Sequence, residues 1–262
     1  MKSEKINVTN DINNKNINTV LQSLANQPPK GSILLDKSLL PSKGVFYPEQ
    51  IYIKKFNTLN IKNLATITEN NADFVINNMI SSCLWGIDTN KILVGDKLWL
   101  LFYLRAFTYN DLPFNVRETC KNCGTVASYS YVLKNLDVVQ YDKELPEYFE
   151  INGDKIVVKF PTISTEMATQ KMKNDPNNVI DIDPGLLDFS SYIYKINDTT
   201  VTLTQAYEYV CDMDAMSFSK YTNMLSDYMF TAHPVGKFEC PHCKQEINVV
   251  IPLSPSFFMP KV

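Results

Sequence analysis

The chain has few of the residues on which common catalytic and nucleic-acid-binding sites depend. Among its 262 residues, His233 and His242 are the only histidines, and Arg105 and Arg117 are the only arginines. This scarcity removes most histidine-based schemes of acid–base catalysis. Because arginine makes most bidentate contacts to phosphate and guanine, it also argues against a nucleic-acid-binding protein.

Long apolar runs and glycine are scarce as well. The longest apolar run covers residues 98–104, far short of the ~20 residues that a membrane-spanning helix needs. Residues 1–18 are polar, so no secretory signal is expected. The eight glycines leave little material for a catalytic lid, and the sequence has no phosphate loop, nucleophile elbow or His-Glu-x-x-His motif. We therefore expect no membrane span, no small-molecule substrate and no catalytic site.

The remaining composition is typical of a folded protein with one large domain or two small ones. Apolar residues make up 45% of the chain and charged residues 20%, which excludes a disordered or fibrous protein. The 25 basic and 28 acidic residues give a formal net charge of −3. No overall positive charge is present that would attract nucleic acid or an anionic membrane.

Two Cys-x-x-Cys pairs are the strongest chemical signal in the sequence. They are Cys120 with Cys123 and Cys240 with Cys243, and a strand-like segment follows each pair. Two intervening residues allow both thiolates to bind one tetrahedral ion at ~2.3 Å. A turn followed by a strand, present twice, is the layout of a zinc ribbon. The sequence therefore predicts one structural Zn²⁺ bound by these four cysteines.

The two pairs are separated by 116 residues, whereas simple zinc ribbons have about 15 to 20. The intervening helical segments are then an insertion whose ends the metal would clamp. A thioredoxin-like redox pair would precede a helix, whereas both pairs here precede strands. Two pairs of free thiols remain an alternative, and disulfides are disfavoured without an export signal. We expect His242 to be an exposed turn residue and Cys83 and Cys211 to be core residues.

The spacing of apolar and turn residues predicts an α+β fold with a helical core, β-hairpins and a split zinc-ribbon-like knuckle pair. Helices are expected over residues 60–80, with a break near Asn71, and over residues 98–107, 185–194, 204–212 and 215–230. Asp183 and Asp214 are the expected caps of the third and fifth of these. Asn152-Gly153 predicts a tight hairpin turn. The helix at 98–104 is apolar on nearly every side, which places it at the centre of the fold.

The termini and one internal segment are expected to be extended. Residues 1–30 form a polar, Asn-rich arm that is flexible or ordered by a partner, and residues 39–56 are expected to form an extended arm or edge hairpin. Residues 31–251 are expected to be the folded domain, divided into 36–135, 136–236 and 237–251. The Pro-rich tail, residues 252–262, contains Phe257 and Phe258, which are costly to leave in water. We predict that these extended segments bind neighbouring subunits.

Two segments carry a resemblance to a known family. Residues 40–47 (Leu-Pro-Ser-Lys-Gly-Val-Phe-Tyr) and residues 96–109 (Asp-Lys-Leu-Trp-Leu-Leu-Phe-Tyr-Leu-Arg-Ala-Phe-Thr-Tyr) are followed by a Cys-x-x-Cys pair. In this order they resemble baseplate proteins of T-even-like contractile-tailed bacteriophages, over about residues 36–250.

The resemblance implies a non-enzymatic structural component or assembly factor of the baseplate hub. Such a protein is made in the host cytoplasm, is located in the virion and has other baseplate proteins as partners. The family offers no catalytic residues. The alternative is a zinc-ribbon protein with a nucleic-acid-binding or regulatory role, which would need a basic stripe beside the knuckles, where only Lys121, Lys237 and Lys244 are found.

Overall fold

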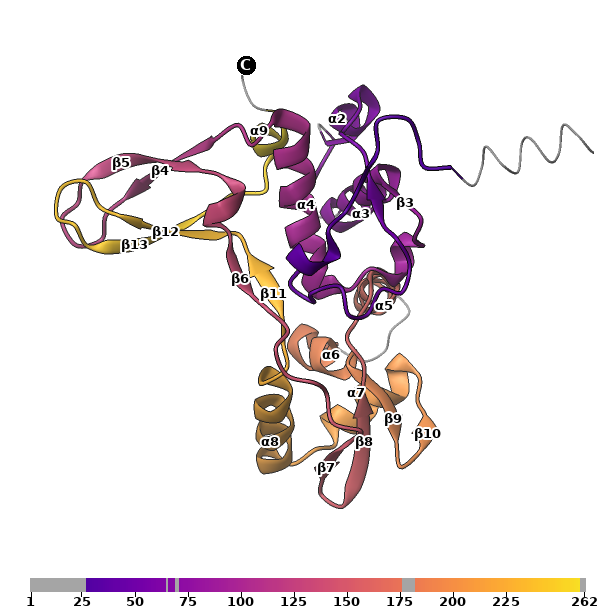
Figure 1. Cartoon of the computed structure of the whole chain (residues 1–262). Helices are drawn as coiled ribbons and strands as arrows, with labels where there is room; N and C mark the ends of the chain where they lie inside the picture. The colour runs from indigo at the N-terminus through magenta and orange to yellow at the C-terminus, as the bar shows by residue number, and fades with distance from the viewer. Residues whose placement is uncertain (1–26, 65, 69–70, 176–181, 260–262) are drawn as a thin grey trace, which may run out of the picture.

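The computed structural model describes residues 27–64, 66–68, 71–175 and 182–259. Within these residues the chain is a mixed helix and sheet fold, consistent with the predicted α+β class, and Figure 1 shows three parts. A helical body contains both ends of the described chain, an arm of two β-hairpins extends from it, and a second lobe follows a two-stranded neck. Most of the predicted N-terminal arm, residues 1–26, lies outside the described residues.

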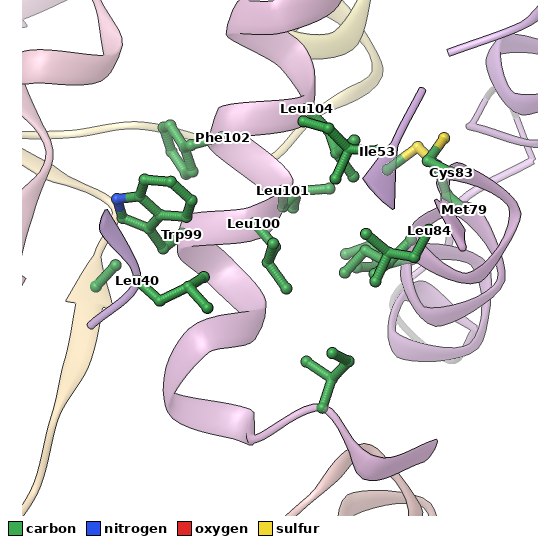
Figure 2. Packing of buried hydrophobic residues seen from close by; sticks show 14 of the residues in the cluster. Leu40, Ile53, Met79, Cys83, Leu84, Trp99, Leu100, Leu101, Phe102 and Leu104 are labelled. Carbon is green, nitrogen blue, oxygen red and sulfur yellow. The ribbon is translucent and has the colours of Figure 1, made fainter. Parts of the chain in front are cut away.

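The body is built around the helix α4 (Val94–Tyr109), which ends at Asn110 in a left-handed conformation with φ of 53°. Leu100, Leu101 and Leu104 are fully buried, which confirms that the apolar run lies at the centre of the fold. Figure 2 shows α4 between Leu40 on one side and the side chains of α3 and the body sheet on the other. The other helices of the body are α2 (Thr58–Leu64), α3 (Ala72–Cys83), α5 (Ile163–Lys173) and α9 (Pro255–Phe258). No helix in the described part of the chain is long and apolar enough to span a membrane.

A three-stranded antiparallel sheet covers one side of α4. Its order is β1 (Ile33–Leu34), β2 (Tyr52–Ile53) and β3 (Leu84–Trp85). The prediction that residues 39–56 form an extended arm or edge hairpin is wrong, because β2 is the central strand and Ile53 is fully buried. The free edges of this sheet belong to β1 and β3. Short 3₁₀ turns in the part of the chain that the structure describes lie at Lys37–Leu39, Thr89–Lys91 and Leu133–Asn135.

The C-terminal segment packs into the body instead of extending from it. Phe257 and Phe258 are both buried, and the ring of Phe257 lies 4.8 Å from that of Phe102 in α4. The Arg105 guanidinium lies 4.8 Å from the Phe257 ring, and Arg105 Nε donates a hydrogen bond of 2.7 Å to the Phe257 carbonyl. The prediction that these two rings serve a partner's surface is therefore wrong, because this chain buries them itself.

The second lobe is a four-stranded antiparallel sheet with its own apolar core and three helices. The strand order is β10 (Thr199–Thr200), β9 (Ile193–Ile196), β8 (Asp154–Val158) and β7 (Phe149–Ile151). The helices are α6 (Pro184–Ser190), α7 (Leu203–Cys211) and α8 (Ala215–Ser226). Asn152 and Gly153 connect β7 to β8 with φ of 53° and 87°, which confirms the predicted hairpin turn.

Helix starts in this lobe agree with prediction better than helix ends. Asp183 and Asp214 cap α6 and α8, as expected. The predicted end of α6 at residue 194 is wrong, because Ile193 already pairs with Val158 in the sheet. The predicted end of α8 at residue 230 is also wrong, because Phe230 has left the helix and packs 4.7 Å from the Phe160 ring. The sequence also gave no indication of α5, β9 or β10.

A short antiparallel ladder forms the neck between the two lobes. It pairs β6 (Asp137–Val139) with β11 (Thr231–His233), with Val138 opposite Ala232. Most of residues 140–230 form the second lobe beyond this ladder, but the segment from Pro161 through α5 packs back on the body, where Thr162 pairs with Leu93. This arrangement brings the two cysteine pairs, far apart in sequence, to the same side of the neck (Figure 1).

Candidate metal centre

Two β-hairpins carry the four cysteines of the predicted site. One consists of β4 (Phe114–Thr119) and β5 (Val126–Tyr131), and the other of β12 (Val235–Glu239) and β13 (Glu246–Val250). Together they form the arm that extends from the body in Figure 1. Each cysteine pair occupies the turn of its hairpin. A strand thus precedes each pair as well as following it, whereas the sequence predicts only the strand that follows.

The two cysteine turns have the same backbone geometry. In the first, the Gly124 N–H donates to the Cys120 carbonyl at 2.8 Å, and in the second, the Lys244 N–H donates to the Cys240 carbonyl at 2.9 Å. Gly124 and Lys244 have φ of 71° and 62°. The left-handed conformation that glycine adopts readily is thus adopted by a lysine in the second turn. Repetition of one turn orients both cysteine pairs alike.

The four sulfur atoms converge at the far end of the arm. All four lie within 4.8 Å of one another. Cys120 Sγ is 3.7 Å from Cys243 Sγ, and Cys123 Sγ is 3.7 Å from Cys240 Sγ. A tetrahedral site with metal–sulfur bonds of ~2.3 Å has sulfur–sulfur separations of about 3.8 Å. The four cysteines therefore lie close together and could bind a metal ion.

The surroundings of the two outer thiols favour the thiolate form, which is the form that binds metal. Hydrogen bonds with the side chain and backbone of Thr125 lower the pKa of Cys123 to about 5. Interactions with the Asn122 side chain and the Gln245 backbone lower the pKa of Cys243. Cys120 and Cys240 are buried. The site thus has two buried sulfurs and two nearer to solvent.

Aromatic side chains join the facing surfaces of the two hairpins beneath the cysteines. The Phe238 ring lies 5.3 Å from the Tyr129 ring and 6.2 Å from the Tyr131 ring. Gly236 permits this approach, because a Cβ atom there would lie 2.6 Å from the Tyr131 ring. Sequence reasoning missed Gly236, although a glycine inside a strand often marks a close approach of this kind.

The cluster does not include His242, Cys83 or Cys211. His242 is exposed, as predicted. Cys83 is buried in α3, as predicted. The prediction that Cys211 is a core residue is wrong: it is exposed at the end of α7, whose buried face consists of Ala206, Tyr207 and Val210.

Basic and acidic side chains are interspersed on the arm. Lys237 lies 3.9 Å from Asp137 at the base of the arm. The charged residues of the two hairpins are Arg117, Lys121, Lys237 and Lys244 with Glu118, Glu239 and Glu246. The described part of the arm therefore does not have the basic stripe that the nucleic-acid-binding alternative would need.

Comparison with known families identifies the group to which this architecture belongs. A model of the T4 bacteriophage base plate protein family matches residues 37–259. The chain belongs to this family. No curated protein and no solved structure gives a match. The match covers most of the chain and includes both cysteine pairs.

Membership of the base plate protein family indicates a structural component of a phage tail. It also indicates association with other tail proteins and a location in the virion tail. The resemblance noted for residues 40–47 and 96–109 is thus confirmed at the level of the family.

The two segments that carried this resemblance lie against each other in the body. Asp96 is fully buried in the first turn of α4. It accepts hydrogen bonds from the Ser42 N–H at 2.8 Å and from the Tyr47 hydroxyl at 2.7 Å. Burial raises the pKa of Asp96. The Tyr47 oxygen in turn accepts from the Leu93 N–H at 2.9 Å. These residues therefore hold the N-terminal segment on the start of the central helix.

Proposed function

We propose that this protein is a non-enzymatic structural or assembly component of the baseplate hub of a contractile-tailed phage. The observation that carries the proposal is the family match over residues 37–259, which includes the body, the arm and the second lobe. The hub position is supported by the resemblance of residues 40–47 and 96–109. The partners are neighbouring tail proteins.

In this proposal, Cys120, Cys123, Cys240 and Cys243 bind one structural Zn²⁺. The donor set fits, because four thiolates are typical ligands of structural zinc and two sulfur pairs lie at 3.7 Å. Such a site has no open position for an activated water, which agrees with a non-enzymatic role.

The ion would stabilise the far end of the arm. An isolated two-stranded hairpin is marginally stable in water, and the arm consists of two such hairpins joined by few aromatic contacts. A metal ion bound between their turns would hold them together, since the free energy of metal binding adds to the stability of the bound form. The arm would then present a rigid surface to a neighbouring subunit.

The proposal also assigns parts and location. Residues 31–251 are the baseplate-protein-like domain, to which the C-terminal segment contributes α9. We place the protein in the tail baseplate of the virion after its synthesis in the host cytoplasm.

Deletion of the gene from its phage tests the proposal. Lysates of the deletion phage should contain tails or tail precursors without complete baseplates in negative-stain electron microscopy, and a plasmid copy should restore them. Complete baseplates and normal infectivity without the gene would contradict the proposal. A plasmid copy with Cys120→Ser and Cys240→Ser tests the zinc site separately, with Cys211→Ser as the matched control.

A further inference from the structure

An open groove is lined by residues of α3 and α5. Figure 1 shows these two helices on the side of the body away from the arm. Its volume is about 560 Å³, within the range of ligand-binding sites. The residues on which the argument depends are Asp73, Phe74, Asn77, Met167, Gln170 and Lys173.

Two large apolar side chains of the groove are open to solvent. Phe74 of α3 is 63% exposed and Met167 of α5 is 47% exposed. The apolar face of α3 that packs on the core consists of other residues, among them Ile76 and Ile80, which are buried. Phe74 and Met167 therefore contribute little to the core of this chain, although both are side chains typical of protein interfaces.

The polar floor of the groove has an excess of hydrogen-bond acceptors. Lys97 Nζ, which is almost buried, lies 2.6 Å from Glu166 Oε2 and 3.1 Å from Asp73 Oδ1. Asn77 Nδ2 donates to Glu166 Oε2 at 3.3 Å, and Gln170 Nε2 donates to Asp73 Oδ2 at 3.4 Å. The donors of Lys97, Asn77 and Gln170 are thus directed at these carboxylates, and two carboxylates face a single buried ammonium group.

Two acceptors of this floor can take a further donor. The Asn77 residue is 7% exposed, and its Oδ1 has no hydrogen-bond partner among the described residues. A buried acceptor without a partner is uncommon and costs free energy. The Asp73 side chain is 50% exposed. Lys173 is exposed at the end of α5 and its charge acts on Asp188 of α6.

We propose that this groove binds a segment of a neighbouring tail protein that packs an apolar side chain on Phe74 and Met167 and directs a lysine or arginine toward Asp73 and Asn77. The charge of the floor favours a cationic donor, because the Asp73–Glu166–Lys97 cluster has a formal charge of −1. The open shape of the groove and the partner proteins implied by the family favour a polypeptide occupant over a small molecule. The inference rests on the proposed function, since it identifies the partner surface.

Site-specific photo-crosslinking in infected cells tests the groove. The gene in the phage is replaced by a copy with p-benzoylphenylalanine at position 74, and a second copy has the same group at position 216. Met216 of α8 is 83% exposed and lies outside the groove, so it is a matched control. Position 74 should crosslink to one segment of one other tail protein, and that segment should contain apolar residues beside a lysine or arginine. Equal, scattered crosslinks from both positions, or a crosslink to a second copy of this chain, would overturn the inference.

Substitution of the exposed apolar residues provides a second test of the groove. The full-length variant with Phe74→Ala and Met167→Ala should keep the unfolding midpoint of the wild type, because both side chains are exposed. Its amount in purified tails or tail intermediates should fall by about tenfold or more, as for loss of interface anchors. Asp73→Asn should give a smaller loss, and Met216→Ala none.

The outcomes separate this inference from the proposed function. If the wild type and the Phe74→Ala, Met167→Ala variant are incorporated equally, the groove assignment is wrong and the baseplate role stands. If the wild type is found in neither tails nor tail intermediates, the proposed function fails and the groove assignment fails with it.

Discussion

Replacement of Leu101 by alanine tests whether α4 is the centre of the body. Leu101 is 1% exposed, so its side chain transfers almost completely from water to the interior on folding. The substitution removes three carbon atoms, which at about 0.8 kcal/mol each lowers the free energy of unfolding by about 2.4 kcal/mol. A cavity that does not collapse raises the loss, up to about 5 kcal/mol. Leucine-to-alanine changes at buried sites span ~2 to 5 kcal/mol for this reason.

The assay is urea unfolding of the full chain, followed by far-ultraviolet circular dichroism, with a thermal melt as a check. A loss of about 3 kcal/mol should lower Tm by roughly 6 to 12 °C for a chain of this size. Leu59→Ala is the matched control, because Leu59 of α2 is 63% exposed and its loss should stay within about 0.5 kcal/mol. A loss below about 1 kcal/mol for Leu101→Ala, or one equal to that of Leu59→Ala, would show that α4 is peripheral.

Three further predictions concern the cysteine cluster, the C-terminal segment and the buried aspartate. The purified protein should contain about one zinc per chain by elemental mass spectrometry. The double variant with Cys120→Ser and Cys240→Ser should not bind zinc, and its arm should exchange amide hydrogens faster. A wild-type protein without metal, or a double variant with unchanged zinc content, would refute the site. Phe257→Ala should lower the free energy of unfolding by ~3 to 5 kcal/mol, because the ring is buried against Phe102 and Arg105. A change below about 1 kcal/mol in urea unfolding would contradict the packing of the C-terminal segment. Burial raises the pKa of Asp96 above 3.8, so the folded state binds this proton more tightly than the unfolded state, and stability should fall as pH rises from 3.8 through the raised pKa. Asp96→Asn should remove that part of the pH dependence of stability. Identical pH profiles of stability for the variant and the wild type would exclude a raised pKa of Asp96 as its cause.

Features with a strong local cause were predictable from the sequence. The apolar run at 98–104 can be satisfied only by burial, and Asn152-Gly153 suits a turn that requires positive φ at both residues. The spacing within each cysteine pair limits where its two sulfur atoms can lie. These signals need no knowledge of distant residues, which explains why they identified the central helix, the hairpin and the cysteine cluster.

Features that depend on distant partners were not predictable. The strands β1, β2 and β3 have two residues each, too few to show a period, so the central place of β2 is visible only once β3 is located. The sequence showed that Phe257 and Phe258 need burial, but not that α4 of the same chain provides it. The start of α5 uses Thr162 and Thr165 as a reciprocal cap in place of a capping glutamate or glutamine, and the helix has few apolar residues.

Burial of the C-terminal segment in the body changes how the C-terminus can be studied. Removal of residues 252–262 would take away Phe257 and Phe258 and destabilise the body, so failure of such a truncation to assemble would not identify a docking tail. Substitutions of exposed residues, such as those in the groove between α3 and α5, separate assembly from folding more cleanly.

Quantitative mass spectrometry of tails and tail-assembly intermediates purified from infected cells would decide whether this protein is a structural part or assembly component of a phage tail baseplate. The protein should co-purify with the other baseplate proteins in a fixed ratio, either in the mature tail or in an intermediate that precedes it. If the protein is abundant in infected cells but absent from both, it is not a baseplate component.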